Sequence, residues 1–382
     1  MKKTIILTSV LTSLIVALLF SREGLCNYSW TTLADFKGID QFSLFLRGDF
    51  YYYRSDIEGK VAVKGDAYLK SFSIGKKAKK SDFTFIVNGK LNAGGLSDAD
   101  GGEIYNGGVY AGSGATFQRV TVTESELISK GNVSLTQLTL KNSIEAEGDV
   151  TINQAVVEGD VHAKGSVTLL NGSQVHGTLT ENDNNLTVNP PFDFNSVNLV
   201  NIANELYKDG TDIGVVDGKI SINVINSGTY YFDINADDFG GNWYLFSINA
   251  PAESTIVIDI IGDPDDIILA YKDFKISGGI TAEDIIFNFI DEDGNLTIEM
   301  HNNSQIYGSI LAPGNIIFYD ASIKGSIMAK NFLEPPIGHN SGQINVVPIP
   351  STLLFLLSSL LIFSFRKSKK SDKKYLLILK LE

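Results

Sequence analysis

Residues 148–165 read GDVTINQAVVEGDVHAKG, and this stretch decides the fold. It begins and ends with glycines that are 17 positions apart, and an inner glycine, Gly159, divides this interval into steps of 11 and 6. The same interval recurs, and each inner glycine again divides it into 11 and 6, in either order. The intervals are Gly48–Gly65, Gly131–Gly148, Gly148–Gly165 and Gly308–Gly325. A fixed short period is typical of a solenoid, in which each repeat stacks on the last.

The six-residue step has a pattern of its own. It reads GKVAVKG at 59–65, GDVHAKG at 159–165 and GSILAPG at 308–314, and a fourth copy at 325–331, GSIMAKN, ends in Asn. Apolar and polar residues alternate between the glycines, which indicates short strands bounded by turns. Glycine at the corners would supply positive φ and close backbone approach. We predict an all-β fold, a parallel β-helix or solenoid with rungs of about 17 residues. The alternative is a β-sandwich with coincidental glycine spacing.

The repeat is interrupted between residues 182 and 300. A polar, proline-terminated break at 182–191 precedes apolar residues at helical spacing, which predict one amphipathic helix over about 194–208, ending at Gly210. Its apolar face is expected to cover the flank of the solenoid. Residues 211–300 are a β-rich middle insertion that could be further rungs or a separate lobe. A hairpin is predicted over 288–298, turning near Asp293-Gly294.

Composition excludes several classes of protein. The chain has 382 residues, of which 43% are hydrophobic and 20% charged, so it is too apolar to be disordered. Its single Cys, Cys26, excludes a disulfide scaffold, and its four scattered His argue against a His-ligated metal. Residues 27–365 carry 21 basic and 41 acidic residues, a charge that repels nucleic acid. Nucleotide binding has no support, because no glycine-rich segment has the ending of a P-loop.

Residues 1–26 are typical of a signal peptide for the general secretory route. Lys2 and Lys3 precede an apolar run from Thr4 to Phe20, and Gly24 and Cys26 stand at the −3 and −1 positions of a cleavage site after Cys26. The alternatives are acylation of Cys26, as in a lipoprotein, and an uncleaved anchor.

The C-terminal end contains a second ordered set of signals. Val347, Pro348, Ile349 and Pro350 precede an apolar segment at 351–365, and a basic cluster of Arg366, Lys367, Lys369 and Lys370 follows it. As a helix, the segment would span about 22 Å of a bilayer core of ~30 Å. We therefore predict a short transmembrane segment, with its basic cluster and the tail at 371–382 on the cytoplasmic side.

This end, residues 346–370, resembles the PEP-CTERM sorting signal in its V-P-x-P form. The resemblance implies recognition by an exosortase-type enzyme of a Gram-negative bacterium, which removes or exchanges the span at the outer face of the inner membrane. A plain C-terminal membrane anchor is the alternative.

Between the two ends, the chain resembles the choice-of-anchor A family. The opening carries FLRGDF at 45–50 and SDIEGKVAVKGD at 55–66, and the closing carries GSILAPG at 308–314 and GSIMAK at 325–330. The resemblance covers about residues 38–345, within a domain that we assign to 27–345. It implies a bacterial surface domain, described as adhesive, ice-binding-like or collagen-binding-like, without established catalytic residues.

Candidate chemistry is sparse. Three acidic clusters, at 98–103, 263–266 and 291–294, could contain a structural Ca²⁺, but solvated turns are the default and the EF-hand register fails at the third. A lyase or glycosidase would need convergent carboxylates. Carboxylates near two successive corners could form such a row: Glu145, Glu147, Asp149, Glu158 and Asp160.

Aromatic side chains and threonines are candidates for binding. At least one ring of Tyr51–Tyr53 is expected to point outward, and the group Tyr230, Tyr231, Trp243 and Tyr244 is expected to be mostly buried. An ice-binding face would need a flat grid of Thr. Thr121 and Thr123 form one pair and Thr136 and Thr139 miss the spacing, so no grid is predicted.

These observations predict an exported, surface-displayed, non-enzymatic adhesive or extracellular-matrix protein. No cofactor or catalytic residue is predicted. The expected partners are the processing enzyme, the membrane through the C-terminal segment, and an extracellular polysaccharide or surface protein. The alternatives are a carbohydrate-active enzyme, a lyase or glycosidase, on the same scaffold, and a structural filler of the matrix.

Overall fold

The predicted parallel solenoid is confirmed. The structure is a computed structural model that describes residues 34–78, 80–123, 126–262, 266–270, 272–291, 293–301, 304–333 and 343–345. The paired strands run parallel to one another, and successive rungs pair in register. Val133 pairs with Val150 and Val150 with Val167, which is the same step along the sequence as the glycine interval. Other rungs are longer, as in the pairing of Val61 with Phe85.

The N-terminal stack comprises residues 44–180, and each complete rung has three faces. The first face contains β1 (Leu44–Leu46), β3 (Val61–Val63), β5 (Ser81–Val87), β8 (Gly107–Ala111), β11 (Leu127–Ser129), β14 (Ile144–Ala146), β17 (Val161–Ala163) and β20 (Leu179–Thr180). The second face contains the first halves of β2 (Phe50–Ile57) and β4 (Ala67–Ile74), then β6 (Lys90–Gly94), β9 (Gly114–Gln118), β12 (Val133–Thr136), β15 (Val150–Asn153) and β18 (Val167–Leu170). The third face contains the second halves of β2 and β4, then β7 (Gly102–Ile104), β10 (Val120–Val122), β13 (Thr139–Leu140), β16 (Val156–Val157) and β19 (Gln174–Val175).

The C-terminal stack comprises residues 211–345. Its first face contains β21 (Thr211–Asp212), β23 (Thr229–Asn235), β25 (Thr255–Ile261), β28 (Ile285–Ile290) and the first halves of β31 (Ser309–Tyr319) and β33 (Ile327–Phe332). The second contains β26 (Asp266–Ala270), β29 (Thr297–His301) and the remainder of β31 and β33. The other strands are β30 (Gln305–Tyr307), β32 (Ser322–Lys324) and β34 (Gln343–Asn345), and a separate parallel sheet of β22 (Lys219–Asn223), β24 (Leu245–Asn249) and β27 (Asp273–Ser277).

Residues 211–300 are therefore further rungs. The predicted hairpin over 288–298 is wrong: β28 pairs with β25 and β31, and β29 pairs with β26 and β31, all in parallel. The turn near Asp293-Gly294 is a corner between two faces of one rung. A short turn containing Asp-Gly fits such a corner as well as a hairpin, so the local sequence does not separate the two.

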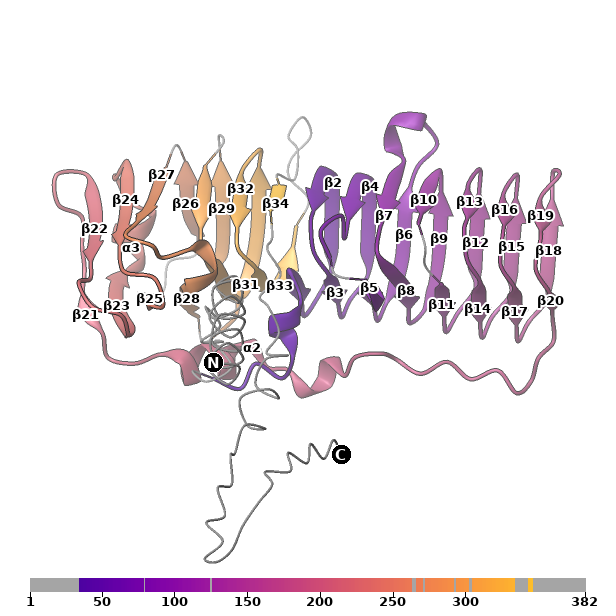
Figure 1. Cartoon of the computed structure of the whole chain (residues 1–382), viewed down its shortest axis with the longest axis horizontal. Coiled ribbons are helices and arrows are strands. Elements are labelled where there is room, and N and C mark those ends of the chain that lie inside the picture. The colour runs from indigo at the N-terminus through magenta and orange to yellow at the C-terminus, as the bar shows by residue number, and fades with distance from the viewer. Residues whose placement is uncertain are drawn as a thin grey trace, which may run out of the picture. The chain divides into compact units, whose positions relative to one another are not determined.

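The two stacks meet where the last rung of the chain lies on the first. Leu44 pairs with Ile327 and Leu46 with Ala329, both in parallel register. The Asp49 backbone N–H also donates to Asn331 Oδ1 at 2.7 Å. Rung stacking thus continues across a junction that no short connection bridges (Figure 1).

A long crossover, residues 181–210, returns from the outer end of the N-terminal stack to the outer end of the C-terminal stack (Figure 1). It contains a 3-10 turn, η5 (Phe194–Ser196), and a helix, α2 (Leu199–Leu206). The single helix expected over about 194–208 is therefore too long, because Val197 and Asn198 are extended and the Asn198 side chain caps the start of α2. Other short helical turns are η3 (Ile39–Gln41), η4 (Asp98–Asp100), α3 (Ala236–Gly240) and η6 (Ala282–Asp284).

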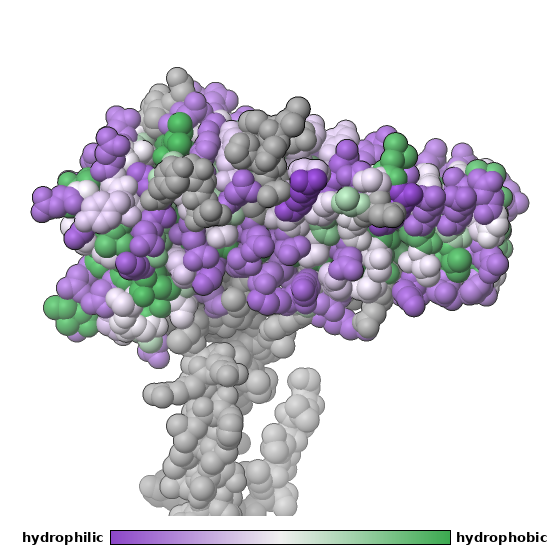
Figure 2. All heavy atoms as spheres, turned by 90° about the horizontal axis from the view of Figure 1, so that it is seen from above, coloured by the Kyte–Doolittle hydropathy of each residue, from purple (hydrophilic) through white to green (hydrophobic). Residues whose placement is uncertain are grey.

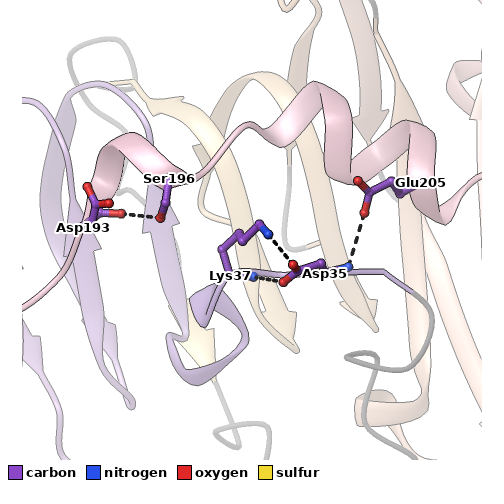
Figure 3. A network of polar contacts seen from close by, with 5 residues as sticks. All are labelled: Asp35, Lys37, Asp193, Ser196 and Glu205. Carbon is purple, nitrogen blue, oxygen red and sulfur yellow. Dashed lines mark hydrogen bonds and ion pairs between the residues drawn. The ribbon is translucent and has the colours of Figure 1, made fainter.

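The crossover covers the outer side of the first face. The buried apolar residues of the crossover are Val188, Phe194, Val197, Leu199, Ile202, Ala203 and Leu206. They pack on outward side chains of the first face, including Phe45, Tyr110, Leu311 and Met328. A polar contact also joins the residues before β1 to the crossover: the Asp35 backbone N–H donates to Glu205 Oε2 at 3.3 Å (Figure 3). Lys37, which also precedes β1, pairs with the Asp35 carboxylate. The amphipathic helix therefore covers the flank of the solenoid, as expected.

The terminal signals predicted from the sequence lie outside the described residues. This holds for Gly24 and Cys26, for the 347–350 motif, for the 351–365 segment and for the basic cluster that begins at Arg366. Within the described part of the chain, no helix has the length and apolar character needed to cross a bilayer.

Candidate binding face

The second face of the N-terminal stack is the candidate site, because the crossover leaves its outer side uncovered. Along each strand, alternate residues point inward and outward. In β12 and β15, for example, Val133, Leu135, Val150 and Ile152 are buried, while their neighbours reach solvent.

One outward column on this face consists of small polar side chains in register. The pairing aligns Asn92, Thr116, Ser134, Thr151 and Thr168 from β6 to β18. We call these five residues the ladder. Neighbouring members are spaced about 4.8 Å apart along the solenoid, and a second outward column lies about 6.6 Å away. The second column is mixed, with Gln118, Thr136, Asn153 and Leu170 in successive rungs.

The ladder is a column of matching hydroxyls that the sequence analysis does not predict, but with a mixed second column beside it, it is not a flat grid of Thr. Four of its members are hydroxyl side chains, and they are in register because the rungs that carry them have almost the same length. The sequence contains the signal: Ser134, Thr151 and Thr168 each stand three residues after a corner glycine. With the repeats aligned on those glycines, these three residues fall in one column.

Aromatic side chains continue the same face toward the junction of the two stacks. Tyr51 and Tyr68 stack with their centroids 5.0 Å apart and 9° between the ring planes, and Tyr68 pairs with Asn92, the first ladder residue. Tyr53 lies beside them under the Arg54 guanidinium, 4.8 Å from its ring centroid. Tyr52, between Tyr51 and Tyr53 in sequence, is buried, whereas these two are partly exposed. The expectation that at least one of these three rings points outward is therefore confirmed.

Beyond the junction, a histidine and a tyrosine occupy the same face. His301 stacks on Tyr319 with centroids 3.9 Å apart, and His301 Nε2 lies 2.8 Å from Glu299 Oε2. Partial burial is the main reason that the pKa of Tyr319 is raised, and the Glu299 charge adds to it. The second face therefore presents planar rings at its centre and small hydroxyl and amide groups toward the N-terminal stack's outer end.

The other candidate aromatics have different environments. Trp243 is buried, with its indole N–H donating to the Phe239 carbonyl at 2.6 Å. Tyr230 and Tyr231 are half-buried on β23, and Tyr244, 54% exposed, lies outside the second face.

Corner carboxylates and amides hold the face in register. The Asp66 N–H donates to Asp49 Oδ1 at 2.8 Å, the Asp149 N–H to Asn132 Oδ1 at 2.9 Å, and the Ser166 N–H to Asp149 Oδ1 at 2.8 Å. Bonds from the backbone and hydroxyl of Ser166 hold the pKa of Asp149 below its usual value. Each corner side chain thereby ties one rung to the next.

The carboxylate row considered for catalysis has structural partners. Glu147 Oε1 accepts a hydrogen bond from the Val188 N–H at 2.6 Å, which fastens the crossover, and Asp160 Oδ1 accepts from the Thr178 N–H at 2.6 Å. Glu158 lies 2.8 Å from His176 Nδ1. Glu145 is on the first face, paired with His162 of the next rung. Each of these carboxylates has a different partner, and the carboxylates do not converge in one cleft.

The acidic clusters form turns where the structure describes them. Asp100 and Ser97 make a reciprocal capping box around η4, and Asp291 accepts hydrogen bonds from the backbone N–H groups of Gly294 and Leu296, both at 2.9 Å. Residues 263–265 lie outside the described part. Among the described residues, no group of three or more His, Cys, Asp or Glu side chains is placed to hold a metal ion.

Comparison with known proteins identifies one family. A family model described as “Putative Ice-binding-like adhesive domain” matches residues 35–139 and 115–346, which together span more than half the chain and contain every described strand. No curated protein and no solved structure matches the chain.

Proposed function

Because the chain belongs to the family of ice-binding-like adhesive domains, we propose that it adheres to polysaccharide through the second face and catalyses no reaction. The observation that carries the proposal is the ladder: five small polar side chains, in register, on a face that the crossover leaves uncovered. A regular column of hydroxyl and amide groups offers repeated hydrogen bonds to a polymer that itself repeats.

The aromatic end of the face supports a sugar ligand in particular. The paired rings of Tyr51 and Tyr68 offer flat apolar surface beside polar groups, the combination that stacks on a sugar ring. Hydrophilic residues cover most of the surface seen from above, and hydrophobic residues gather in small groups toward both ends (Figure 2). A neutral polysaccharide suits such a surface better than an apolar partner does.

The test is binding of the purified protein to a panel of insoluble neutral polysaccharides. We expect the Tyr51→Ser/Tyr68→Ser double variant to bind about tenfold more weakly, since two ring contacts are lost. Tyr244→Ser is the matched control, because that tyrosine is exposed outside the second face. Thr151→Arg should also weaken binding by placing a bulky charge in the ladder, whereas Thr139→Arg on the third face should not.

Other outcomes would favour the other functions. Equal binding by all variants would place the ligand elsewhere on the molecule. Release of new sugar ends during incubation would favour a lyase or glycosidase. Absence of binding to any polymer would favour a structural filler of the matrix.

Binding to ice is a second candidate, and the column of hydroxyls at Thr116, Ser134, Thr151 and Thr168 favours it. It predicts that the protein changes the shape of growing ice crystals and that Thr151→Arg abolishes the effect. Unchanged ice growth, together with polysaccharide binding, would leave adhesion to sugars as the function.

We also propose that the chain is exported and sorted through its two ends. The order of Val347–Pro350, the 351–365 segment and the basic cluster supports processing by an exosortase-type enzyme. Intact mass and location of the native protein should be compared in cells with and without that enzyme. We expect a mass ending near residues 347–350 outside the inner membrane; a full-length C-terminus retained in that membrane would overturn the proposal.

A further inference from the structure

A column of acidic and amide side chains runs along the outer side of the first face in the C-terminal stack. Asp212 pairs with Asp233, Asp233 with Asp259, and Asp259 with Asn288, all in parallel register. In-register neighbours lie about 4.8 Å apart, so their side chains are adjacent. Like charges directly opposite one another destabilise a sheet unless another charge compensates them.

Two members of this column are fully buried, and three oxygens lack partners. Asp259 and Asn288 are 0% exposed. Asn288 Nδ2 donates to Asp259 Oδ1 at 2.6 Å, so the amide is directed at the carboxylate. Within the described part of the chain, Asp233 Oδ1, Asp259 Oδ2 and Asn288 Oδ1 are buried without a hydrogen bond. Buried polar atoms without partners are rare in native proteins and call for an explanation.

The crossover closes over these oxygens. Asn288 Nδ2 also donates to the Ala203 carbonyl of α2 at 3.0 Å, and the Gly210 N–H donates to Asp233 Oδ2 at 3.1 Å. The column therefore lies beneath the end of the crossover, where the chain enters the C-terminal stack.

The charge around the column is strongly negative. Residues 211–345 contain 5 basic and 19 acidic residues, whereas residues 44–180 contain 14 and 15. Burial, with the Asp233 charge adding to it, raises the pKa of Asp259 to about 7, as expected for a carboxyl group without a compensating charge. An acidic surface of this kind raises the local concentration of cations.

We propose that Asp233, Asp259 and Asn288 bind a calcium ion that fastens the crossover to the C-terminal stack. The available donors are all oxygens, which hard cations prefer, and calcium accepts irregular mixtures of carboxylate, amide and carbonyl oxygens, whereas magnesium demands near-ideal octahedral geometry. Two carboxylates balance the charge of one divalent ion. This site is separate from the second face and does not depend on the proposed adhesion.

The test uses the purified full chain after removal of divalent ions. Terbium luminescence is a direct probe, because Tyr207 and Tyr231 lie close enough to Asp259 to feel its charge and their rings can sensitise a bound lanthanide. We expect a terbium signal that calcium displaces, and an unfolding temperature that rises with calcium and less with magnesium. Asp233→Asn and Asp259→Asn should each weaken calcium binding at least tenfold. Asp212→Asn, exposed in the same column, should leave it unchanged.

The competing explanation is one proton shared by Asp233 and Asp259. It predicts no terbium signal, no response of the wild-type unfolding temperature to calcium, and a higher unfolding temperature for Asp259→Asn at neutral pH without calcium. That set of results would overturn the proposal. If Asp259→Asn does not fold, the half-buried Asp233→Asn carries the same comparison.

Discussion

At the scale of single residues, the glycines at the corners of the rungs allow the backbones of adjacent rungs to approach closely. A Cβ added to Gly148 would lie 2.2 Å from Asn132 Oδ1 and 2.7 Å from the Gly131 carbonyl carbon, and one on Gly65 would lie 2.6 Å from the Gly48 carbonyl carbon. Neither glycine has a positive φ. Gly65 and Gly148 are therefore required because adjacent rungs touch there. Gly308 and Gly325, with φ of 144° and 153°, do have the positive φ that the sequence pattern predicts.

Left-handed conformations also occur at larger residues between the second and third faces. Gln137 and Gln154 have φ of 54° and 51°, and Gln137 Nε2 donates to Gln154 Oε1 at 3.0 Å. Stacked amides offset part of the cost of this backbone, which is about 1–2 kcal/mol per residue. The repeat thus depends on side chains that only become neighbours when the rungs stack.

Gly148→Ala is expected to lower the free energy of unfolding by about 1–3 kcal/mol, because the added methyl overpacks the contact between two rungs. Gly214→Ala is the matched control, since a Cβ there meets its nearest atom at 3.8 Å. Urea unfolding of both variants measures the difference. Equal stability would mean that the rungs separate at this corner without cost.

At the scale of elements, the position of a strand in the stack decides how deeply its inward side chains are buried, and so how much they contribute to the stability of the fold. Ile152 and Leu169 occupy the same inward position in successive rungs. Ile152 is 0% exposed, whereas Leu169, on β18 at the end of the stack, is 43% exposed. The next rung covers Ile152, and among the described strands none stacks beyond β18.

We expect Ile152→Ala to reduce stability by about 2–5 kcal/mol and Leu169→Ala by less than about 1 kcal/mol, since only the first opens a cavity. Thermal or urea unfolding of the pair is the measurement. A comparable loss at both positions would show that another segment or a second molecule covers the end rung.

The crossover helix α2 has only eight residues, too short to be stable alone. Its buried apolar residues on the first face must therefore supply its stability. Leu206→Ala should reduce the free energy of unfolding by about 2–5 kcal/mol, because Leu206 is fully buried. Asn204→Ala, on the exposed side of the helix, should change it by less than about 0.5 kcal/mol. If both variants are as stable as the wild type, the helix does not contribute to the fold.

At the scale of the whole domain, the chain begins and ends its solenoid at the junction between β1 and β33. Parallel pairing of Leu44 with Ile327 and of Phe45 with Met328 joins the first described strand to one near the end of the domain. The junction buries the same kinds of side chain as any other pair of rungs, so the two stacks share one continuous core.

Hydrogen exchange should show this continuity. The amides of β1 and β33 are expected to exchange as slowly as those of β12 and β15, and those of β18–β20 faster, since the end rung has neighbours on one side among the described strands. Mass spectrometry of peptides covering these strands is the measurement. Fast exchange at β1 and β33 would indicate that the stacks open independently.

The sequence by itself determined the parallel solenoid, the repeat length of its regular rungs and a covering helix, because glycine spacing and strand alternation are local and repeat along the chain. Export and sorting also come from local patterns at the two ends, and they stay predictions. Only the tertiary structure decided the order of rungs in space, since the pairing of Leu44 with Ile327 has no local signal. The two sites differ in this respect. Ser134, Thr151 and Thr168 follow corner glycines by the same three residues, so this part of the ladder is present in the sequence pattern, whereas the pairing alone adds Asn92 and Thr116 to it. Asp233, Asp259 and Asn288 are distant in sequence and become neighbours only because irregular rungs stack in register.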